Sequence, residues 1–304
     1  MSKNILVIGS LNTDISITMK KMPIIGETVL GDSLQYTNGG KGANQACSIG
    51  KLNGKVEMLG CIGNDTFGKK QEENLNKFNV NTKNLKTSET APTGTAIIYV
   101  DEYGKNSIVV VAGANTDCNT DYLKTKEKSF HNSDYILLQL EIPMDAVEYS
   151  VKKGKELDKT IILNPAPAPE IICDEILKNV DFFTPNESEL QKLANLEKIE
   201  SLEDIEKGAK FFLEKGVKNV IVTLGENGVL LVNNNITQHF PANKVKAIDT
   251  TAAGDCFNGA FVLGLSEGKS IANSIIFANK ASSIAVTRKG AQSSIPTREE
   301  VENL

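Results

Sequence analysis

Short apolar runs recur along the chain at intervals that suit the strands of one large sheet. Most of them are apolar at every position instead of alternating, which is typical of strands buried on both faces of a largely parallel sheet. We expect these strands at 5–8, 56–59, 136–140, 160–163, 182–184 and 220–224. Amphipathic stretches lie between many of the runs and predict helices at 67–78, 144–156, 187–193, 204–214, 255–265 and 271–286. The pattern predicts a three-layer α/β fold, a mostly parallel sheet with helices on both faces.

Two segments depart from this rhythm, at about 14–38 and 92–111. In the first, Ile15, Ile17 and Met19 alternate with polar residues, and the second contains two apolar runs on either side of a Glu-Tyr-Gly-Lys turn at 102–105. Alternation gives a strand one apolar face, and the turn indicates a hairpin. We therefore expect a small β-sheet lid that covers a cleft or pairs with another subunit. Apart from this lid, we expect residues 1–304 to form a single domain.

Composition and charge narrow the function. The formal net charge of −5 argues against a general nucleic-acid or anionic-membrane binder, since such proteins are usually basic. The five cysteines are scattered and lack C-x-x-C spacing, which favours a reducing compartment over a disulfide framework or a zinc site. The apolar run near the N-terminus is too short for a signal peptide, so we expect a cytoplasmic protein.

The most informative motif is Asp249-Thr-Thr-Ala-Ala-Gly-Asp255, which leads into an expected helix. The N–H groups of Ala252, Ala253 and Gly254, together with the positive helix end, can hold an anion such as a phosphate. A carboxylate beside a bound anion makes chemical sense if it takes a proton from a hydroxyl that attacks phosphorus. Asp255 could also be an ordinary helix cap. The motif suggests phosphoryl transfer to an alcohol.

Polar side chains follow two expected strands, where ligands of open α/β sheets bind. Asn12 and Asp14 follow the first strand and Glu141 follows the strand at 136–140. Amide and carboxylate groups there could recognise hydroxyls. The alternative interpretations are an Asx turn for Asn12 and Asp14, and a solvated loop charge for Glu141.

A glycine-rich cluster precedes another expected helix. Gly39, Gly40 and Gly42 allow a ligand to approach the backbone closely, and Asn44 lies in the first turn of that helix. The cluster is not a Walker A loop, because no Ser or Thr follows its Lys.

Two further groups suit a nucleotide and its metal. Asn186 and Glu189 share a helix face and could hold a hydrated Mg²⁺, although their spacing also forms a capping box. The two interpretations are compatible. The turn at 223–228 reads as a hairpin turn, which in a kinase could cradle the nucleotide.

Jointly, these motifs resemble the ribokinase-like sugar kinases of the phosphofructokinase-B type. The resemblance runs from 9 to 296 and rests on Gly39-Gly-Lys-Gly-Ala-Asn-Gln, Ala252-Ala-Gly-Asp, Asn164-Pro-Ala-Pro-Ala, Thr184-Pro-Asn-Glu and Val286-Thr-Arg-Lys-Gly-Ala-Gln. It implies the ribokinase-like fold with its lid, a homodimer formed through the lid strands, and ATP, Mg²⁺ and K⁺ as cofactors. It also implies transfer of a phosphoryl group from ATP to the 5-hydroxyl of D-ribose, which gives D-ribose 5-phosphate and ADP for ribose catabolism.

The resemblance implies a role for each matching residue, with Asp255 as the base and Ala252, Ala253 and Gly254 as the anion hole. The ribose site would comprise Asn12, Thr13, Asp14, Gly40, Lys41, Gly42, Asn44, Glu141 and Asp255. ATP would contact Asn186, Thr223, Leu224, Gly225, Glu226, Asn227, Gly228, Gly254 and Asn279. Glu189 would support Mg²⁺ through water. A potassium ion would be bound by Asp249, Thr251, Ala285, Arg288, Gly290 and Ser294, several of them through carbonyls. Cys256 stands where relatives often have Thr, which affects packing near the base and removes none of these roles.

Three alternatives stay open. The first is a kinase for 2-deoxyribose or another sugar or nucleoside. If Asn12 faces C2, its amide favours a hydroxylated sugar, because an unpaired buried amide is costly. The second is a catalytically silent sugar-binding regulator, for which loss of Asp255 would be the expected mark. The third is an NAD-dependent oxidoreductase, although the chain has no G-x-G-x-x-G fingerprint after its first strand.

Overall fold

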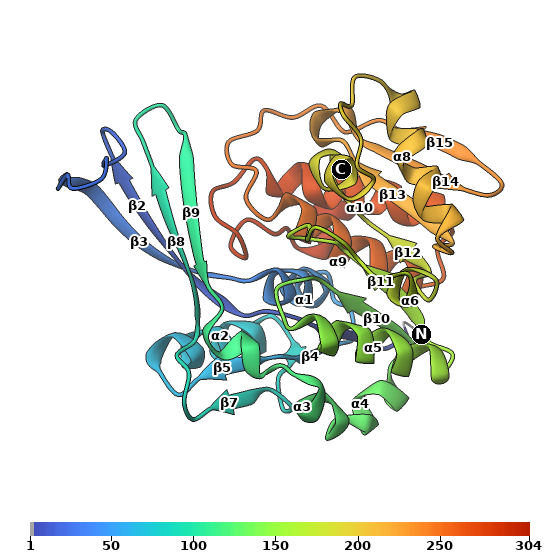
Figure 1. Cartoon of the computed structure of the whole chain (residues 1–304), viewed down its shortest axis with the longest axis horizontal. Helices are drawn as coiled ribbons and strands as arrows, with labels where there is room; N and C mark the ends of the chain where they lie inside the picture. Colours follow the sequence, from blue (N-terminus) through green and yellow to red (C-terminus); the bar gives the residue numbers. More distant parts are fainter. Residues whose placement is uncertain (1–2) are drawn as a thin grey trace.

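The computed structural model describes residues 3–304, and its central feature within them is a nine-stranded sheet (Figure 1). The pairings are parallel except for the antiparallel pairs β13–β14 and β14–β15. In spatial order the strands are β15 (Thr237–Phe240), β14 (Val229–Asn233), β13 (Asn219–Thr223), β12 (Phe182–Phe183), β11 (Thr160–Leu163), β10 (Tyr135–Leu138), β1 (Ile5–Ile8), β4 (Val56–Leu59) and β6 (Val80–Asn81). The predicted mostly parallel sheet is confirmed.

Helices cover both faces of this sheet, as predicted. Alternate residues of β1 show why its apolar run is continuous, since Ile5 and Val7 join one buried cluster and Leu6 and Ile8 the other. The first cluster includes side chains of α1 (Lys41–Lys51), α2 (Thr66–Lys77), α9 (Ala253–Ser266), α10 (Ile271–Ala285) and α11 (Arg298–Glu302). The second includes side chains of η1 (Gly113–Asp117), α3 (Thr120–Lys124), α4 (Glu127–Asn132), α5 (Met144–Glu156), α6 (Asp174–Leu177), α7 (Glu187–Leu193) and α8 (Leu202–Glu214).

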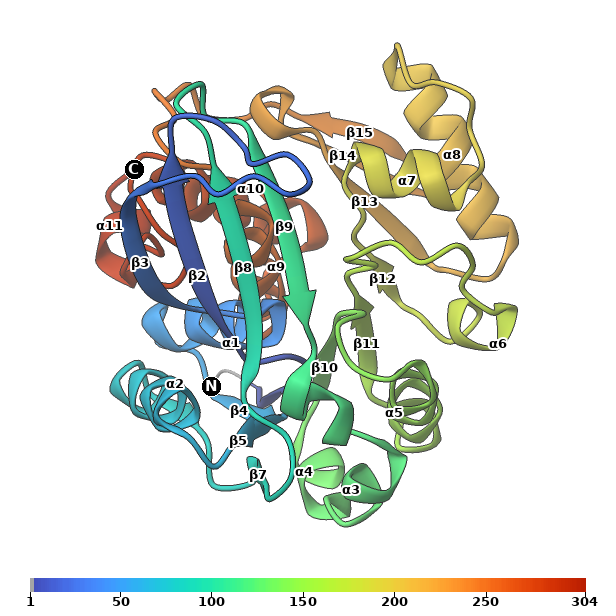
Figure 2. The same ribbon diagram turned by 60° about the vertical axis from the view of Figure 1, so that its left-hand side comes forward.

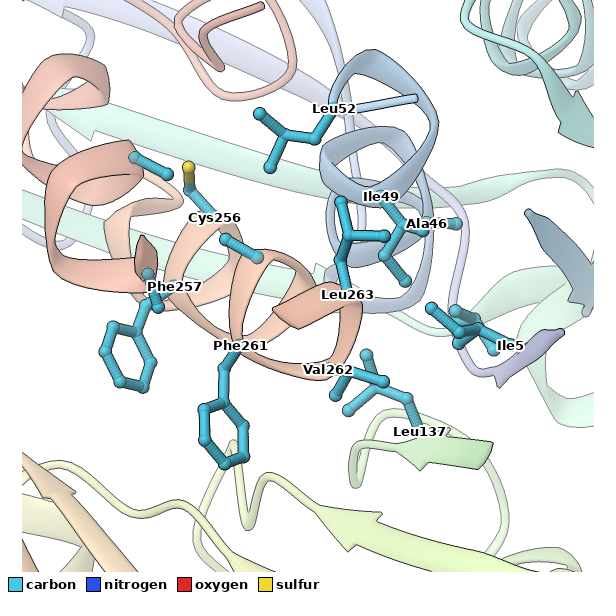
Figure 3. Close-up of a cluster of buried hydrophobic side chains, with 14 of the residues drawn as sticks. Ile5, Ala46, Ile49, Leu52, Leu137, Cys256, Phe257, Phe261, Val262 and Leu263 are labelled. Carbon is cyan, nitrogen blue, oxygen red and sulfur yellow. The ribbon is translucent and has the colours of Figure 1, made fainter. Parts of the chain in front are cut away.

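Helices α1 and α9 lie against each other, and this contact positions the site described below (Figure 3). Figure 3 shows Ile49 of α1 and Leu52, which directly follows α1, near the side chains of α9, among which Phe261 points toward the sheet. A β-carbon at Gly259 would lie 2.6 Å from Cβ of Ser48 and 2.7 Å from the Gln45 carbonyl oxygen, so only glycine allows the two helices to approach this closely. Cys256 is buried at the same contact, and burial raises the pKa of its thiol to about 12, as expected for a packing residue.

A second sheet projects from the core on one side (Figures 1 and 2). We call it the lid sheet, and within the described chain its order is β3 (Gly31–Gly39), β2 (Asn12–Met19), β8 (Gly94–Val100) and β9 (Asn106–Val111). Strands β8 and β9 form the predicted hairpin around the turn at 102–105. The predicted separate sheet is therefore confirmed. A short parallel pair, β5 (Cys61–Gly63) with β7 (Lys86–Ser88), lies below its base.

Some element boundaries differ from the sequence patterns. Helix α8 begins two residues before the expected start, because Ser201 and Asp204 form a capping box that includes the first turn. Strand β10 ends at Leu138, since the N–H of Leu140 donates to the carbonyl of Ala166 instead of continuing the ladder. Within residues 3–304, no helix combines the length and apolarity needed to cross a membrane.

Candidate active site

The N-termini of α1 and α9 bring Asp255 together with two amides. Asn44 Nδ2 donates to Asp255 Oδ2 at 2.9 Å, and Gln45 Nε2 donates to Asp255 Oδ1 at 3.0 Å. Asp255 is 7% exposed and lies in the first turn of α9. Both carboxylate oxygens are therefore held by neighbouring residues of one rigid helix, which fixes the direction of their remaining lone pairs.

Burial dominates the electrostatics of Asp255 and raises its pKa. The positive charge of Lys41 and the hydrogen bonds from Asn44 and Gln45 act in the opposite direction, and the negative charge of Glu141 adds to the rise. A carboxylate that binds a proton more readily than usual, yet is kept oriented by two donors, suits a general base.

The amide of Gln45 belongs to a buried network that sequence reasoning missed. Its Nε2 also donates to Oδ1 of Asn164 at 3.1 Å, and its Oε1 accepts from Nε2 of Gln139 at 2.6 Å. Asn164 in turn donates to the carbonyl of Thr184 at 2.9 Å. One signal was present in the sequence, because Gln139 is a polar residue inside the apolar run at 136–140. A fully buried glutamine needs partners, and here the partner is another glutamine.

Asn44 also has an acceptor with no partner. Its Oδ1 is buried and accepts no hydrogen bond from residues 3–304, while its Nδ2 is committed to Asp255. A buried unpaired acceptor costs free energy, which a ligand hydroxyl recovers by donating to it. The amide of Asn44 can therefore link the base to a hydroxylated ligand.

The predicted sugar-site residues of strand β2 divide between two faces, because side chains alternate along a strand. Asp14 lies over Gly39, where an added β-carbon would be 2.2 Å from its Oδ2. Burial, and then the charges of Glu141 and Asp255, raise the pKa of Asp14 to about 7, against the charge of Lys41. Thr13 instead lines a groove of about 330 Å³ beside Tyr36 and α2. The side chain of Thr13 therefore lies apart from those of Asn12 and Asp14, which share the other face.

Glu141 is tied to the start of α1. Its Oε2 accepts the Ser10 hydroxyl and the backbone N–H of Lys41, the latter at 3.1 Å. Burial alone would lower the pKa of Lys41, but its pKa is raised because the charges of Asp255, Glu141, Glu189 and Asp14 outweigh burial. Lys41 therefore stays protonated and balances a strongly acidic site, although its Nζ forms no ion pair with them in the described structure.

The predicted anion hole lies at the start of α9. Ala252 adopts the left-handed conformation with φ 57°, which is strained for a residue with a β-carbon. The N–H of Ala253 donates to the carbonyl of Thr250 at 3.2 Å, whereas the N–H of Gly254 has no acceptor in residues 3–304. Within residues 3–304, a β-carbon at Gly254 would meet nothing within 4 Å. There is thus open space beside a free N–H at a helix N-terminus, as anion binding requires.

The predicted nucleotide residues lie on neighbouring elements. Asn186 and Glu189 form the capping box predicted as one of the two compatible interpretations, and Asn186 bridges to Thr223 at the end of β13. Burial raises the pKa of Glu189, and the negative charge of Asp255 contributes to the rise.

The turn after β13 contains the short helix η2 (Gly225–Asn227), in which a β-carbon at Gly225 would meet nothing within 4 Å in the described part of the chain. The predicted ATP residues Asn227 and Gly228 lie against the segment at 239–242, where the Asn227 carbonyl contacts the His239 ring and Gly228 packs against the backbone at 240–242. In the same segment, the Pro241 carbonyl accepts a hydrogen bond from Nδ2 of Asn279 at 3.4 Å. The 240–242 segment therefore connects the turn with Asn279 on α10.

The loops predicted to bind potassium lie side by side. Asp249 Oδ2 accepts from the N–H of Gly290 at 2.8 Å, and its Oδ1 accepts from the N–H of Thr251 at 2.9 Å. Burial opposes ionisation of Asp249, but these N–H groups outweigh it and lower its pKa. The guanidinium of Arg288 pairs with the carboxylate of Glu300, so the backbone carbonyl of Arg288 is the group that could contact a cation. In residues 3–304, no group of three or more His, Cys, Asp or Glu side chains is arranged to hold a metal ion.

Comparisons with known proteins agree with this geometry. The model of the pfkB family of carbohydrate kinases matches residues 2–298. A ribokinase of Haemophilus influenzae is 40% identical over 300 residues, which cover 99% of this chain and 97% of the relative. A deoxyribokinase of Salmonella typhimurium is 34% identical over 297 residues, covering 98% and 97%. Among solved structures, Arabidopsis thaliana ribokinase complexed with ribose and ATP has a TM-score of 0.93 and 32% identity, covering 100% of this chain and 98% of that one.

Proposed function

Because the chain belongs to the pfkB family of carbohydrate kinases, we propose that it transfers the γ-phosphoryl group of ATP to the 5-hydroxyl of D-ribose. The products are D-ribose 5-phosphate and ADP, and the reaction serves ribose catabolism. The observation that carries the proposal is the pairing of Asp255 with Asn44. It places a base of raised pKa beside a buried acceptor that has no partner in residues 3–304. The similarity to ribokinases over the whole chain supports ribose as the acceptor.

In the proposed reaction, Asp255 accepts the proton of the 5-hydroxyl as its oxygen attacks the γ-phosphorus. The bond between that phosphorus and the bridging oxygen breaks, and ADP leaves with the electron pair. Asn12, Asp14, Lys41, Asn44 and Glu141 hold the sugar hydroxyls, with the backbone of Thr13, Gly40 and Gly42 close to the sugar. The N–H groups at 252–254 stabilise the charge on the transferred phosphoryl group.

We assign the nucleotide to the side of the site formed by α7 and the turn after β13. ATP then contacts Asn186, the residues at 223–228 and Asn279. The carboxylate of Glu189 suits a hydrated Mg²⁺, because only its Oε2 is used within the described chain, by the N–H of Asn186. The ion supplies charge neutralisation on the phosphates when bound.

A monovalent cation is the second ion of the proposal. Potassium is held by Asp249, Thr251, Ala285, Arg288, Gly290 and Ser294, mostly through carbonyls, next to the strained residue Ala252. The hydrogen bond between Asp249 and Gly290 supports this assignment because it already joins the two loops. Activity should be higher in potassium than in an equal concentration of a large cation such as tetramethylammonium, and equal rates would remove the ion from the account.

The lid strands form a homodimer interface in this proposal. Leu34, Tyr36 and the strand residues Ile108, Val109 and Val110 are each more than half exposed, which is unusual for so many apolar residues on one small sheet. Sedimentation velocity at working concentration should show a dimer, and Val109→Lys with Ile108→Lys should shift it to a monomer. A wild-type monomer would contradict this interface. The net charge of −5 supports an enzyme that binds neither nucleic acid nor membranes, and the five scattered cysteines support a cytoplasmic location.

A substrate panel with ATP tests the proposal. We expect the largest kcat/KM for D-ribose among ribose, 2-deoxyribose, fructose and adenosine, with phosphorus coupled to C5 in the product by nuclear magnetic resonance. A larger value for 2-deoxyribose would support the alternative that the deoxyribokinase relative raises. Absence of ADP formation with every sugar would revive a non-catalytic sugar-binding role.

A further inference from the structure

We propose that Asn115 sets the sugar specificity of the site by fixing the orientation of the Asn12 side-chain amide, in a contact that only glycine at position 94 allows. The inference rests on the proposed function and adds positioning residues to it. Asn115 lies in η1, after the lid hairpin, and is 1% exposed.

The hydrogen bonds of Asn115 admit only one orientation. The backbone N–H of Leu11 can only donate, so the atom of Asn115 that faces it at 2.9 Å must be the oxygen Oδ1. The nitrogen Nδ2 then faces the Leu11 carbonyl at 3.3 Å, which can only accept. The side-chain amide of Asn115 is thus hydrogen-bonded to both the N–H and the carbonyl of Leu11, the residue that precedes strand β2.

The second hydrogen of Asn115 Nδ2 fixes the orientation of the Asn12 amide. It points at an atom of the Asn12 amide 2.7 Å away, and since the donor belongs to Asn115, that atom must be the oxygen Oδ1. The nitrogen of Asn12 is therefore the free end of the amide. It makes no hydrogen bond within residues 3–304 and, unlike the hydroxyl of Thr13, is not shut off from solvent. Asn12 consequently presents a donor on the face of β2 that it shares with Asp14.

Gly94 makes room for this contact. A β-carbon at this position would lie 2.2 Å from Nδ2 of Asn115 and 2.3 Å from Oδ1 of Asn12. Gly94 begins strand β8 and is paired in register with Asn12, so a side chain there would push the two amides apart. The φ of Gly94 is not in the left-handed region, and alanine would therefore add no backbone strain.

The result is a site that offers opposite polarities to a sugar hydroxyl. The side-chain N–H of Asn12 needs a hydrogen-bond acceptor, and the ionised carboxylate of Asp14 needs a hydrogen-bond donor. A hydroxyl group can satisfy both at once, whereas a C–H group in its place leaves both unpaired. Selectivity for a hydroxylated sugar over its deoxy analogue then depends on Asn115, although Asn115 does not touch the sugar.

Two variants test the inference through independent perturbations. Asn115→Asp keeps the acceptor for the Leu11 N–H but removes the donor, so the Asn12 amide turns its nitrogen toward position 115. Gly94→Ala separates the same amides without changing charge. For both, the ratio of kcat/KM for ribose to that for 2-deoxyribose should fall at least about tenfold. The KM for ribose should rise while the KM for ATP stays unchanged. The control is Asn119→Ala, which removes the cap of α3 in the same segment and should keep the ratio.

The outcomes separate this inference from the proposed function. If the wild-type protein does not phosphorylate ribose, the proposed function fails and the inference fails with it. If the wild type phosphorylates ribose but both variants keep the wild-type ratio, only the inference is overturned. Equal losses for the two sugars, or a matching rise in the KM for ATP, would show a merely structural role and overturn it as well.

Discussion

Replacing Gln45 by leucine should weaken catalysis without removing any group that touches the sugar or ATP. The side chain is fully buried, and its Nε2 donates to Asp255 at 3.0 Å and to Asn164 at 3.1 Å. A buried hydrogen bond to a charged group is worth about 1.5–3 kcal/mol. If that stabilisation is needed to orient the ionised base, kcat/KM for ribose should fall about 10- to 150-fold.

The same variant should change the pH dependence in a predictable direction. The amide of Gln45 lowers the pKa of Asp255, because it bonds the ionised form. Its loss should raise that pKa further, so protonated and inactive Asp255 persists to higher pH. The acidic limb of the kcat profile should therefore move to higher pH.

Gln139 provides the matched comparison. It contacts Gln45 at 2.6 Å but not Asp255, so Gln139→Leu should give a smaller loss. The double variant should be no worse than Gln45→Leu alone, because both act through one hydrogen bond. Thermal unfolding identifies any general loss of stability. A Gln45→Leu enzyme with kcat/KM within about twofold of wild type and an unmoved acidic limb would refute the reasoning.

Further predictions concern the helix start, the helix contact and the sugar site. Gly254→Ala should leave the melting temperature unchanged, since the new β-carbon meets nothing within 4 Å, but should lower kcat by filling the anion space; normal turnover would contradict this. Gly259→Ala should instead cost about 1–3 kcal/mol of stability, measured by denaturant unfolding, because α1 and α9 must separate. The pKa of Asp14 is about 7, so ribose affinity measured by calorimetry should be constant above pH 8 and fall about tenfold per unit below pH 6, where the protonated carboxyl no longer accepts hydroxyl protons. The Asp14→Asn variant should bind ribose weakly at every pH. If its ribose affinity still falls below pH 6 as in the wild type, the pH dependence belongs to a group other than Asp14.

The main elements could be predicted because their signals are local. Fully apolar runs indicate strands with two buried faces, and the alternation of Ile15 and Ile17 with Ser16 indicates a different kind of strand, which is why the lid sheet could be separated from the central sheet. In the structure, both Ile15 and Ile17 are only half-buried and belong to neither core cluster. The helix carrying Asp255 begins at Ala253, two residues before the start expected from the sequence. The run of small residues does not indicate that Ala252, which precedes this helix, adopts the left-handed conformation.

The buried amides could not be assigned roles in the same way. Gln45 lies on α1, whereas Gln139 and Asn164 directly follow strands β10 and β11, and the contacts among them depend on how α1 packs against the sheet. Asn115 has no periodic neighbours that indicate its partner, which lies 103 residues away in the sequence. Side chains whose function is to orient other side chains leave little local pattern, because their requirement is a tertiary contact.

The most direct test of the account is the rate of ADP formation by Asp255→Asn with saturating ribose and ATP, together with ribose affinity by calorimetry. Asparagine keeps the shape of the side chain but cannot take the proton, so we expect turnover to fall about 10²- to 10⁴-fold while the ribose dissociation constant stays within a few-fold of wild type. Turnover close to that of the wild-type enzyme would contradict the assignment of Asp255 as the base.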